Sequence, residues 1–313
     1  MLRYVVRRVL YAIPILFGVS LITFVLFYAT VSPEQMARSK LSARNPTPEQ
    51  IQDWLKQHGY DKPLHVQFRK HMAELLLLRF GNSDTTGEPI WQMIRNGVGP
   101  SAVVASLSFF ALLIVTISLA LAVAYYRGTY VDLWGTFLCV ILMSITVLVY
   151  LIAGQYLFGK VLKYAPLAGY RPGLDAARFA VLPLIVALFS RLGANVRFYR
   201  TVMLEEMHQD YVRTARAKGV SERGVLFQHV LKNAATPILT SVVLAIPFLL
   251  MGSLLTESFF AIPGLGTMLV DAITNQDFAV VRAMVFLGTI LYIIGAILTD
   301  ISYTLVDPRV RLE

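Results

Sequence analysis

Long apolar runs, separated by polar segments, are the feature that most constrains how this chain can fold. The first run follows Arg8 and continues to about Val31. A secretory signal core has roughly 7–15 apolar residues, whereas a helix that crosses a bilayer needs about 20, so we expect an uncleaved first span. Five further candidates lie at about 101–125, 134–158, 179–199, 236–258 and 284–306. The runs together predict an all-α polytopic membrane protein with six transmembrane helices.

Composition supports a membrane protein and argues against other classes. The chain has 313 residues, of which 56% are hydrophobic and only 15% charged, whereas a soluble protein carries roughly 25% charged residues. The net charge of +9 could indicate nucleic acid as a partner, but in a membrane chain Lys and Arg mark cytoplasmic loops. We therefore expect no nucleic acid. The single Cys139 excludes an intrachain disulfide.

The fourth run is the weakest candidate for a span. Its uninterrupted apolar part covers only residues 179–190 before Arg191, so an interfacial segment is an alternative. If the run spans, it continues to Arg200, and Arg191 and Arg197 must face protein or lipid headgroups rather than acyl chains.

The distribution of basic residues predicts the orientation of the chain. Six spans place both termini on one side, and the segments on that side are rich in Lys and Arg, with six basic residues in 200–235 alone. The positive-inside rule therefore predicts cytoplasmic termini. The segment 159–178, which also carries four basic residues, is a local exception.

The orientation divides the chain into three parts. Residues 1–31 form the N-terminal cytoplasmic residues and first span, 32–100 an extracytoplasmic cap, and 101–313 a five-helix core. In the cap, Thr47 and Pro48 predict a helix start and Gly59 its end. A second amphipathic stretch runs from about Leu64 to Phe80. The cap could meet an external partner or only cover the membrane surface.

The polar segment DYVRTARAKGVSERGVLFQHVLKNA, residues 210–234, interrupts the apolar runs inside the predicted loop 201–235. Residues 211–218 read as a helix that ends at Gly219, because glycine accepts the left-handed conformation required there. Ser221 then predicts the N-cap of a second helix. Small residues around the turn would allow another protein surface to approach closely, but an amphipathic hairpin could equally adhere to anionic lipid.

The same segment resembles the cytoplasmic EAA loop of ABC importer permeases. In the pattern E-A-A-x3-G-x9-I-x-L-P, residues 213–215 occupy the E-A-A positions and Gly219 the glycine, whereas residues 229–232 depart from I-x-L-P. The variant found here is similar to that of dipeptide, oligopeptide and nickel importer permeases of the B type. The resemblance extends over the chain through LRYVVRRVLYAIPILFGVSLITF, FGNS at 80–83, ESFFAIPGLG at 257–266 and DISYTLVDPRVR at 300–311.

The resemblance implies a function and a set of partners. In that family the EAA loop is a coupling helix between the fourth and fifth spans, which docks on an ATPase subunit. The corresponding residues here are Asp210, Arg213, Thr214, Ala215, Arg216, Lys218 and Gly219. The implied partners are a second homologous permease, two ATPase subunits that hold ATP and Mg, a soluble extracytoplasmic substrate-binding protein and membrane lipid, in a bacterial inner membrane. The chain has no G-x4-G-K-[ST] motif for a phosphate, and the resemblance implies neither an enzyme nor a cofactor in this chain.

Acidic residues suggest an external gate or a contact with the binding protein, against the alternative of a well-formed turn. The candidates near the outer end of the fifth predicted span are Glu257, Pro263, Gly264, Gly266, Asp271 and Asp277.

Asp300, inside the last run, is the one further acidic candidate. An intramembrane carboxylate suggests a proton relay, which gives a proton-coupled secondary transporter as the alternative function. Its position near the predicted cytoplasmic end favours a structural ion pair, with Arg309 as the candidate partner. The spacing of His58, His65 and His71 does not place three ligands on one helix face, so we expect no metal site.

Overall fold

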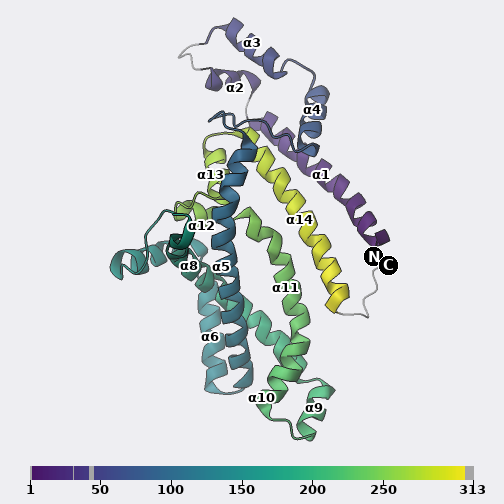
Figure 1. The fold of residues 1–313 in the computed structure, drawn as a ribbon, viewed down its shortest axis with the longest axis vertical. Coiled ribbons are helices and arrows are strands. Elements are labelled where there is room, and N and C mark those ends of the chain that lie inside the picture. The colour runs from purple at the N-terminus through teal and green to yellow at the C-terminus, as the bar shows by residue number, and fades with distance from the viewer. Residues whose placement is uncertain (1, 31, 42–45, 307–313) are drawn as a thin grey trace. The chain divides into compact units, whose positions relative to one another are not determined.

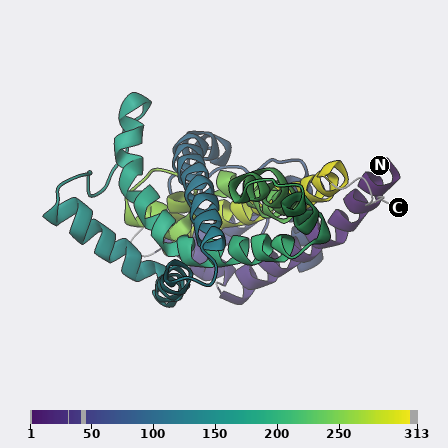
Figure 2. The same cartoon turned by 90° about the horizontal axis from the view of Figure 1, so that it is seen from below.

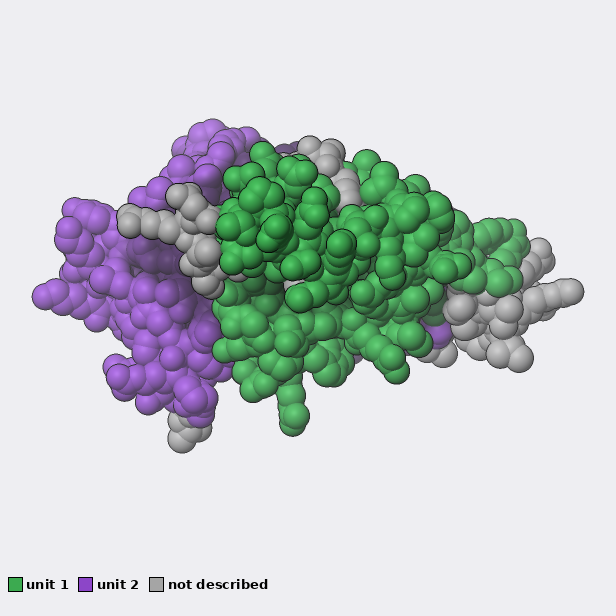
Figure 3. All heavy atoms as spheres, turned by 90° about the horizontal axis from the view of Figure 1, so that it is seen from above, with its two compact units in different colours: residues 1–97, 268–297, 312–313 green, residues 98–267, 298–311 purple. Residues whose placement is uncertain are grey.

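The computed structural model describes residues 2–30, 32–41 and 46–306. Apart from one isolated bridge between Asn82 and Pro89, the regular structure in these residues is helical. The predicted all-α class is therefore confirmed. The described residues divide into two compact units, one formed by residues up to 97 with 268–297, the other by 98–267 with 298–306 (Figure 3). The helices α5, α13 and α14 contribute residues to both units.

The first unit contains the N-terminal helix and the small helices that follow it. Its elements are α1 (Leu2–Thr30), α2 (Pro33–Lys40), α3 (Pro48–His58), α4 (Leu64–Leu76), and parts of α5 (Ile90–Tyr125), α13 (Leu265–Thr274) and α14 (Phe278–Val306) (Figure 1). Thr47 caps α3 as predicted, in a reciprocal capping box with Gln50. Gly59 ends α3 with φ 77°, the left-handed conformation that favours glycine.

Aromatic side chains pack α4 against α1. The ring of Phe68 lies 5.6 Å from that of Phe17 and 5.3 Å from that of Phe24, both edge-on. His71 is buried beside the same rings, with its centroid 5.5 Å from that of Phe24. The amphipathic pattern predicted from Leu64 onward therefore forms a helix whose apolar face contacts α1.

The second unit consists of long helices joined by short polar segments. Its further elements are α6 (Tyr130–Ser144), α7 (Val147–Gly154), the π-turn η1 (Gln155–Val161), the 3₁₀ turn η2 (Gly173–Asp175), α8 (Ala176–Met207), α9 (Asp210–Ala217), α10 (Glu222–Gly224), the π-turn η3 (Val225–Val230), α11 (Leu231–Met251) and α12 (Leu254–Phe259). Figure 2 shows the same helices from below.

Helices long and apolar enough to cross a membrane agree with the sequence prediction in number. Within the described residues there are five, or six if the bent pair α6 and α7 is one span. The weakest candidate, at 179–199, belongs to the 32-residue α8, whose length suits a span rather than a short interfacial segment.

The third predicted span is not the straight helix that its apolar run suggested. It breaks at Ile145, which has an extended backbone, and the two halves meet at 93°. A break leaves carbonyl groups of the last helical turn without partners. The hydroxyl of Tyr150 donates to the carbonyl of Leu142 at 2.8 Å, which satisfies one of them and holds the bend.

The fifth predicted span, 236–258, is also corrected. Helix α11 ends at Met251 because Gly252 takes φ 73° and ψ 178°, a conformation essentially restricted to glycine. Glu257 therefore lies on the separate short helix α12.

A buried core joins the helices of the second unit around α8. It includes Ala120 and Ala124 of α5, Cys139 of α6 and Met203 of α8. It continues to one end through residues of α9, η3 and α11, namely Val212, Ala215, Leu226, Val230 and Ala234. Helices α6 and α8 approach closely at Gly193, where a Cβ would overlap the carbonyl oxygen of Cys139.

Candidate functional site

The hairpin segment, residues 209–230, begins with α9 and has two distinct faces. Val212 and Ala215 are buried in the core of the second unit, as the sequence pattern predicted. On the opposite face the side chains of Asp210 and Arg213 are 97% and 75% exposed. Thr214 and Lys218 are exposed as well. Helix α9 is thus fixed by one face and exposes the other to solvent.

The turn after α9 follows the predicted geometry. Gly219 has φ 78°, and no atom lies within 4 Å of the position that a Cβ would take. Ser221 caps the next helix, since its hydroxyl accepts the backbone N–H of Gly224 at 3.3 Å. That helix continues through η3 into α11, so the hairpin segment is joined directly to a long apolar helix.

Two polar contacts that the sequence did not indicate hold α9 in place. The guanidinium of Arg216 donates to both carboxylate oxygens of Glu222 across the turn. The hydroxyl of Tyr211 donates to Glu206 at the end of α8. Burial and this hydrogen bond raise the pKa of Tyr211 to about 12, so the phenol remains a donor at any physiological pH. Arg216, predicted as part of a docking surface, is engaged within the segment.

The glycine turn, residues 252–267, encloses the carboxylate of Glu257, whose side chain is 1% exposed. One oxygen accepts the backbone N–H of Ser253 at 3.0 Å and the other that of Gly266 at 2.8 Å. Ser101 lies beside them and accepts the backbone N–H of Leu265 at 2.8 Å. Burial raises the pKa of Glu257, and the hydrogen bonds from Ser253, Ser101 and Gly266 oppose that shift.

The glycines of this turn make room for the carboxylate. A Cβ on Gly252 or Gly264 would overlap an oxygen of Glu257, and one on Gly266 would lie 2.7 Å from the carbonyl oxygen of Ser253. The carboxylate is therefore inaccessible to a binding protein or a peptide in this conformation.

Asp277 is similarly buried, at 2% exposure, and clasps the loop that contains the FGNS motif. Its carboxylate accepts the hydroxyls of Ser83 and Thr85 and the backbone N–H groups of Asp84 and Val280. Burial raises the pKa of Asp277, but these donors outweigh it and hold the pKa below the usual range. Asp271 by contrast is exposed on α13.

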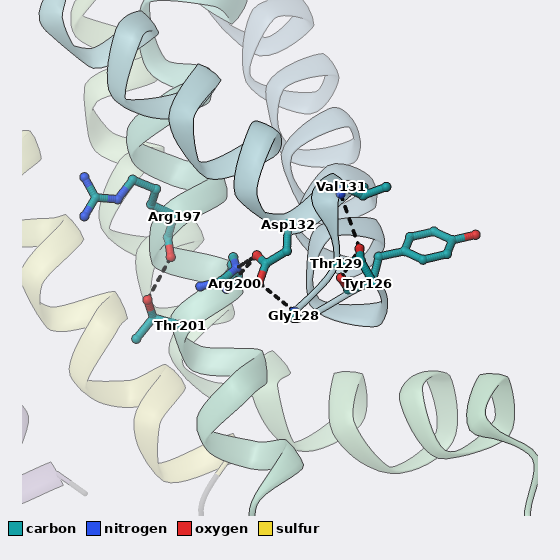
Figure 4. A network of polar contacts seen from close by, with 8 residues as sticks. All are labelled: Tyr126, Gly128, Thr129, Val131, Asp132, Arg197, Arg200 and Thr201. Atoms are coloured by element: carbon teal, nitrogen blue, oxygen red, sulfur yellow. Dashed lines mark hydrogen bonds and ion pairs between the residues drawn. The ribbon is translucent and has the colours of Figure 1, made fainter.

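An ion pair between Asp132 and Arg200 is the main polar contact that sequence reasoning missed. Asp132 lies in the first turn of α6 and Arg200 near the end of α8, and their atoms approach to 2.6 Å (Figure 4). An acidic residue in a first turn ordinarily indicates only a favourable interaction with the helix dipole. No local pattern pairs it with a residue 68 positions away.

The remaining predicted residues are placed separately. Asp300 is half-buried in α14, and Arg309 lies outside the described residues, so their ion pair stays a prediction. His71 packs on α1 and His65 is exposed. In the part of the chain that the structure describes, no group of three His, Cys, Asp or Glu side chains is arranged to hold a metal ion.

The fold defines a polytopic all-α membrane protein with a rigidly anchored, polar helical hairpin. Residues 115–312 match the family described as binding-protein-dependent transport system inner membrane component, and residues 1–97 match its N-terminal family. The chain belongs to this family, and the resemblance inferred from the motifs is confirmed.

Relatives of full length carry more specific names. The chain is 32% identical to the Di/tripeptide transport system permease protein DppB of Pseudomonas aeruginosa, over 99% of each chain. It is 29% identical to the Oligopeptide transport system permease protein AppB of Bacillus subtilis, over 99% of this chain and 100% of that one. The protein is thus a multi-pass permease subunit of an inner-membrane transport system.

Proposed function

We propose that this chain is the permease subunit of an ATP-driven importer of peptides, and that α9 is the contact for its ATPase subunit. The observation that carries the proposal is the two-faced geometry of α9. Its buried face lies in the same core as α5, α6, α8 and α11, so α9 is in contact with the long helices that a motor would have to move. Its exposed face leaves Arg213 and Lys218 for a partner.

The proposed assembly contains further subunits. A second homologous permease would complete the path, two ATPase subunits would hold ATP and Mg, and a soluble extracytoplasmic binding protein would deliver the cargo. Membership of a binding-protein-dependent family supports the last of these. In the membrane orientation that the positive-inside rule predicts, both termini and the hairpin segment are cytoplasmic, and α2 to α4 belong to the extracytoplasmic cap.

Peptide cargo is supported by the names of DppB and AppB, which are di/tripeptide and oligopeptide permeases. The glycine turn with Glu257, Pro263, Gly264 and Gly266 would then be part of the external gate, with Asp277 securing the neighbouring loop in its own unit. Asp271, which is exposed, is the acidic residue of the set best placed to touch a binding protein.

Gly219→Trp tests the docking of α9. The turn has open space around Gly219, so the bulky ring projects outward and obstructs a partner, at the cost of some backbone strain. Gly59→Trp is the matched control, because Gly59 also ends a helix with a positive φ and open surroundings. We expect ATPase subunits to co-purify with wild type and with the Gly59 variant, and to be lost from the Gly219 variant.

The readouts are ATPase activity of the purified complex and ATP-dependent uptake of labelled di- and tripeptides into vesicles. Retention of both activities in the Gly219 variant would show that α9 is not the dock. Uptake that follows a proton gradient and collapses in Asp300→Asn would instead support the secondary transporter.

A further inference from the structure

We propose that the Asp132–Arg200 ion pair is the positioning contact that makes the α5–α6 turn move together with the hairpin segment. This inference rests on the proposed coupling of α9 to an ATPase subunit. The residues concerned all belong to the second unit, and the contacts of the α5–α6 turn with α8 are drawn in Figure 4.

The α5–α6 turn, residues 126–129, is short and internally bonded. The hydroxyl of Thr129 donates to the carbonyl of Tyr126 at 2.6 Å and accepts the backbone N–H of Val131 at 3.3 Å. Gly128 has φ 74° and donates its N–H to one carboxylate oxygen of Asp132 at 3.1 Å. The turn is therefore rigid, and Asp132 is part of it.

The other oxygen of Asp132 connects this turn to α8. It accepts from Nε of Arg200 at 2.8 Å and from Nη2 at 2.6 Å. Side-chain exposures of 15% for Asp132 and 23% for Arg200 mean that solvent screens the pair less than a surface pair. A carboxylate that binds the turn through one oxygen and a guanidinium through the other restricts how far the two elements can slide.

Arg200 is well placed to transmit movement from the hairpin segment. It lies about two helical turns before the end of α8 at Met207, and α9 starts at Asp210. The end of α8 is itself tied to α9 by the hydrogen bond from Tyr211 to Glu206. The contacts run continuously from α9 through α8 to the α5–α6 turn.

The apolar core alone does not fix this relationship. The core on α5 includes the small side chains of Ala120 and Ala124 beside Leu121, and apolar burial has no preferred direction, unlike the charged contact between Asp132 and Arg200. With the ion pair present, the ATP-driven displacement of α9 reaches α5 and α6. Without it, the hairpin segment moves while these helices lag behind.

The test uses the full complex, reconstituted in vesicles, and measures peptide transported per ATP hydrolysed. The variants are Asp132→Asn, Arg200→Gln, Arg200→Lys and the charge exchange Asp132→Arg with Arg200→Asp. Arg197→Gln is the matched control, because Arg197 lies about one turn earlier on α8, contacts the sulfur of Met143 and points away from Asp132 (Figure 4).

We expect Asp132→Asn and Arg200→Gln to lower transport per ATP at least about fivefold while ATPase subunits remain bound and active. Arg200→Lys and the charge exchange should recover part of this ratio. Arg197→Gln should stay within about twofold of wild type.

A second measurement is independent of the cargo. Spin labels are placed on Arg127→Cys in the turn and Gln228→Cys in η3, both exposed positions, while the native Cys139 is buried. In wild type the separation of the labels should be the same without nucleotide and with trapped ATP. In Arg200→Gln it should change by several ångströms on ATP binding.

An unchanged transport ratio and an unchanged label separation in Arg200→Gln would overturn the proposal. Proportional loss of insertion, ATPase activity and transport would also overturn it, since that indicates a structural role only. If no ATPase associates with wild type, the proposed function itself fails, and this inference fails with it. If ATPase subunits bind wild type and Arg200→Gln alike, the proposed function stands, and the transport ratio then tests the ion pair alone.

Discussion

The guanidinium of Arg216 spans the turn at Gly219 and contacts both oxygens of Glu222, at 2.8 Å and 3.1 Å. The contact joins the last turn of α9 to the first turn of the next helix. No atom lies within 4 Å of the position of a Cβ on Gly219, so this pair, rather than packing of a side chain at position 219, connects the two helices across the turn.

Glu222→Gln should loosen the turn without unfolding the hairpin segment. The side chains are 31% and 55% exposed, so solvent screening limits the stabilisation to roughly 0.5–1 kcal/mol. We expect faster hydrogen exchange of the amides in α9. Asp210→Asn is the control, because it removes a longer pair with Arg213 between more exposed side chains; an equal effect in both variants would contradict the role given to Glu222.

Gly264→Ala should disrupt the glycine turn. The new methyl group would overlap Glu257 and Ser101, and overpacking of this kind costs about 1–3 kcal/mol. The expected result is a lower midpoint of detergent-induced unfolding for the purified permease. Gly18→Ala on α1, where nothing lies within 4 Å, should leave the midpoint unchanged or raise it slightly.

Asp277→Asn should release the loop that carries Ser83 and Thr85. The variant loses a charged acceptor of several hydrogen bonds, which we expect to cost about 2–3 kcal/mol, and residues 82–89 should become sensitive to proteolysis. Asp271→Asn, on an exposed residue, should not have this effect.

The hydrogen bonds of Asp277 also predict that the stability of this loop depends on pH. Because the folded state holds the pKa of Asp277 below its usual 3.8, the carboxylate stabilises the fold above that pH. This contribution is lost as pH falls through the folded-state pKa. Proteolysis of residues 82–89 at decreasing pH measures this dependence in wild type and in Asp277→Asn. Equal protection of the loop in both proteins at every pH would contradict the prediction.

His71 predicts a separate pH dependence at milder acidity. Burial lowers the pKa of His71 to about 4, and the charge of Arg282 on α14 adds to the effect, while a hydrogen bond to the backbone of Ser20 on α1 opposes it. Between pH 6.5 and 4 the imidazole of His71 is therefore mostly neutral in the folded state, whereas it is protonated in the unfolded state. Stability should fall by up to about 3 kcal/mol as pH decreases across this window.

Hydrogen exchange of α4 between pH 7 and pH 4 measures this dependence. His71→Gln should flatten the profile, and His65→Gln, on an exposed residue of the same helix, should leave it as in wild type. Identical profiles for wild type and His71→Gln would exclude His71 as the titrating group.

Local patterns predicted the elements of the fold with fair accuracy. Thr47, Gly59, Gly219 and Ser221 occupy the helix ends assigned to them because capping depends on the residue and its near neighbours. The breaks at Ile145 and Gly252 were missed because an apolar composition indicates that a segment lies in an apolar environment. It does not indicate whether the helix axis is straight or bent.

Contacts between distant residues could not be predicted in the same way. Asp132 and Arg200, or Ser83 and Asp277, are each separated by one or more helices in the sequence, and only the folded chain brings them together. Glu257 was singled out by its acidic character in an apolar setting, and its role stays a prediction. Its enclosure by glycines follows from the positive φ of Gly252 and from close backbone approach at Gly264 and Gly266, which composition does not reveal.

That enclosure has a consequence for how the turn can vary in evolution. A methyl group on Gly264 has no room because the carboxylate of Glu257 and the hydroxyl of Ser101 fill the space beside it, and Gly252 is held in addition by its positive φ. In homologous chains with shorter residues at positions 101 and 257, the constraint on Gly264 is relaxed, whereas that on Gly252 remains. Substitutions at positions 101, 257 and 264 should accordingly be correlated, and Gly252 should vary least.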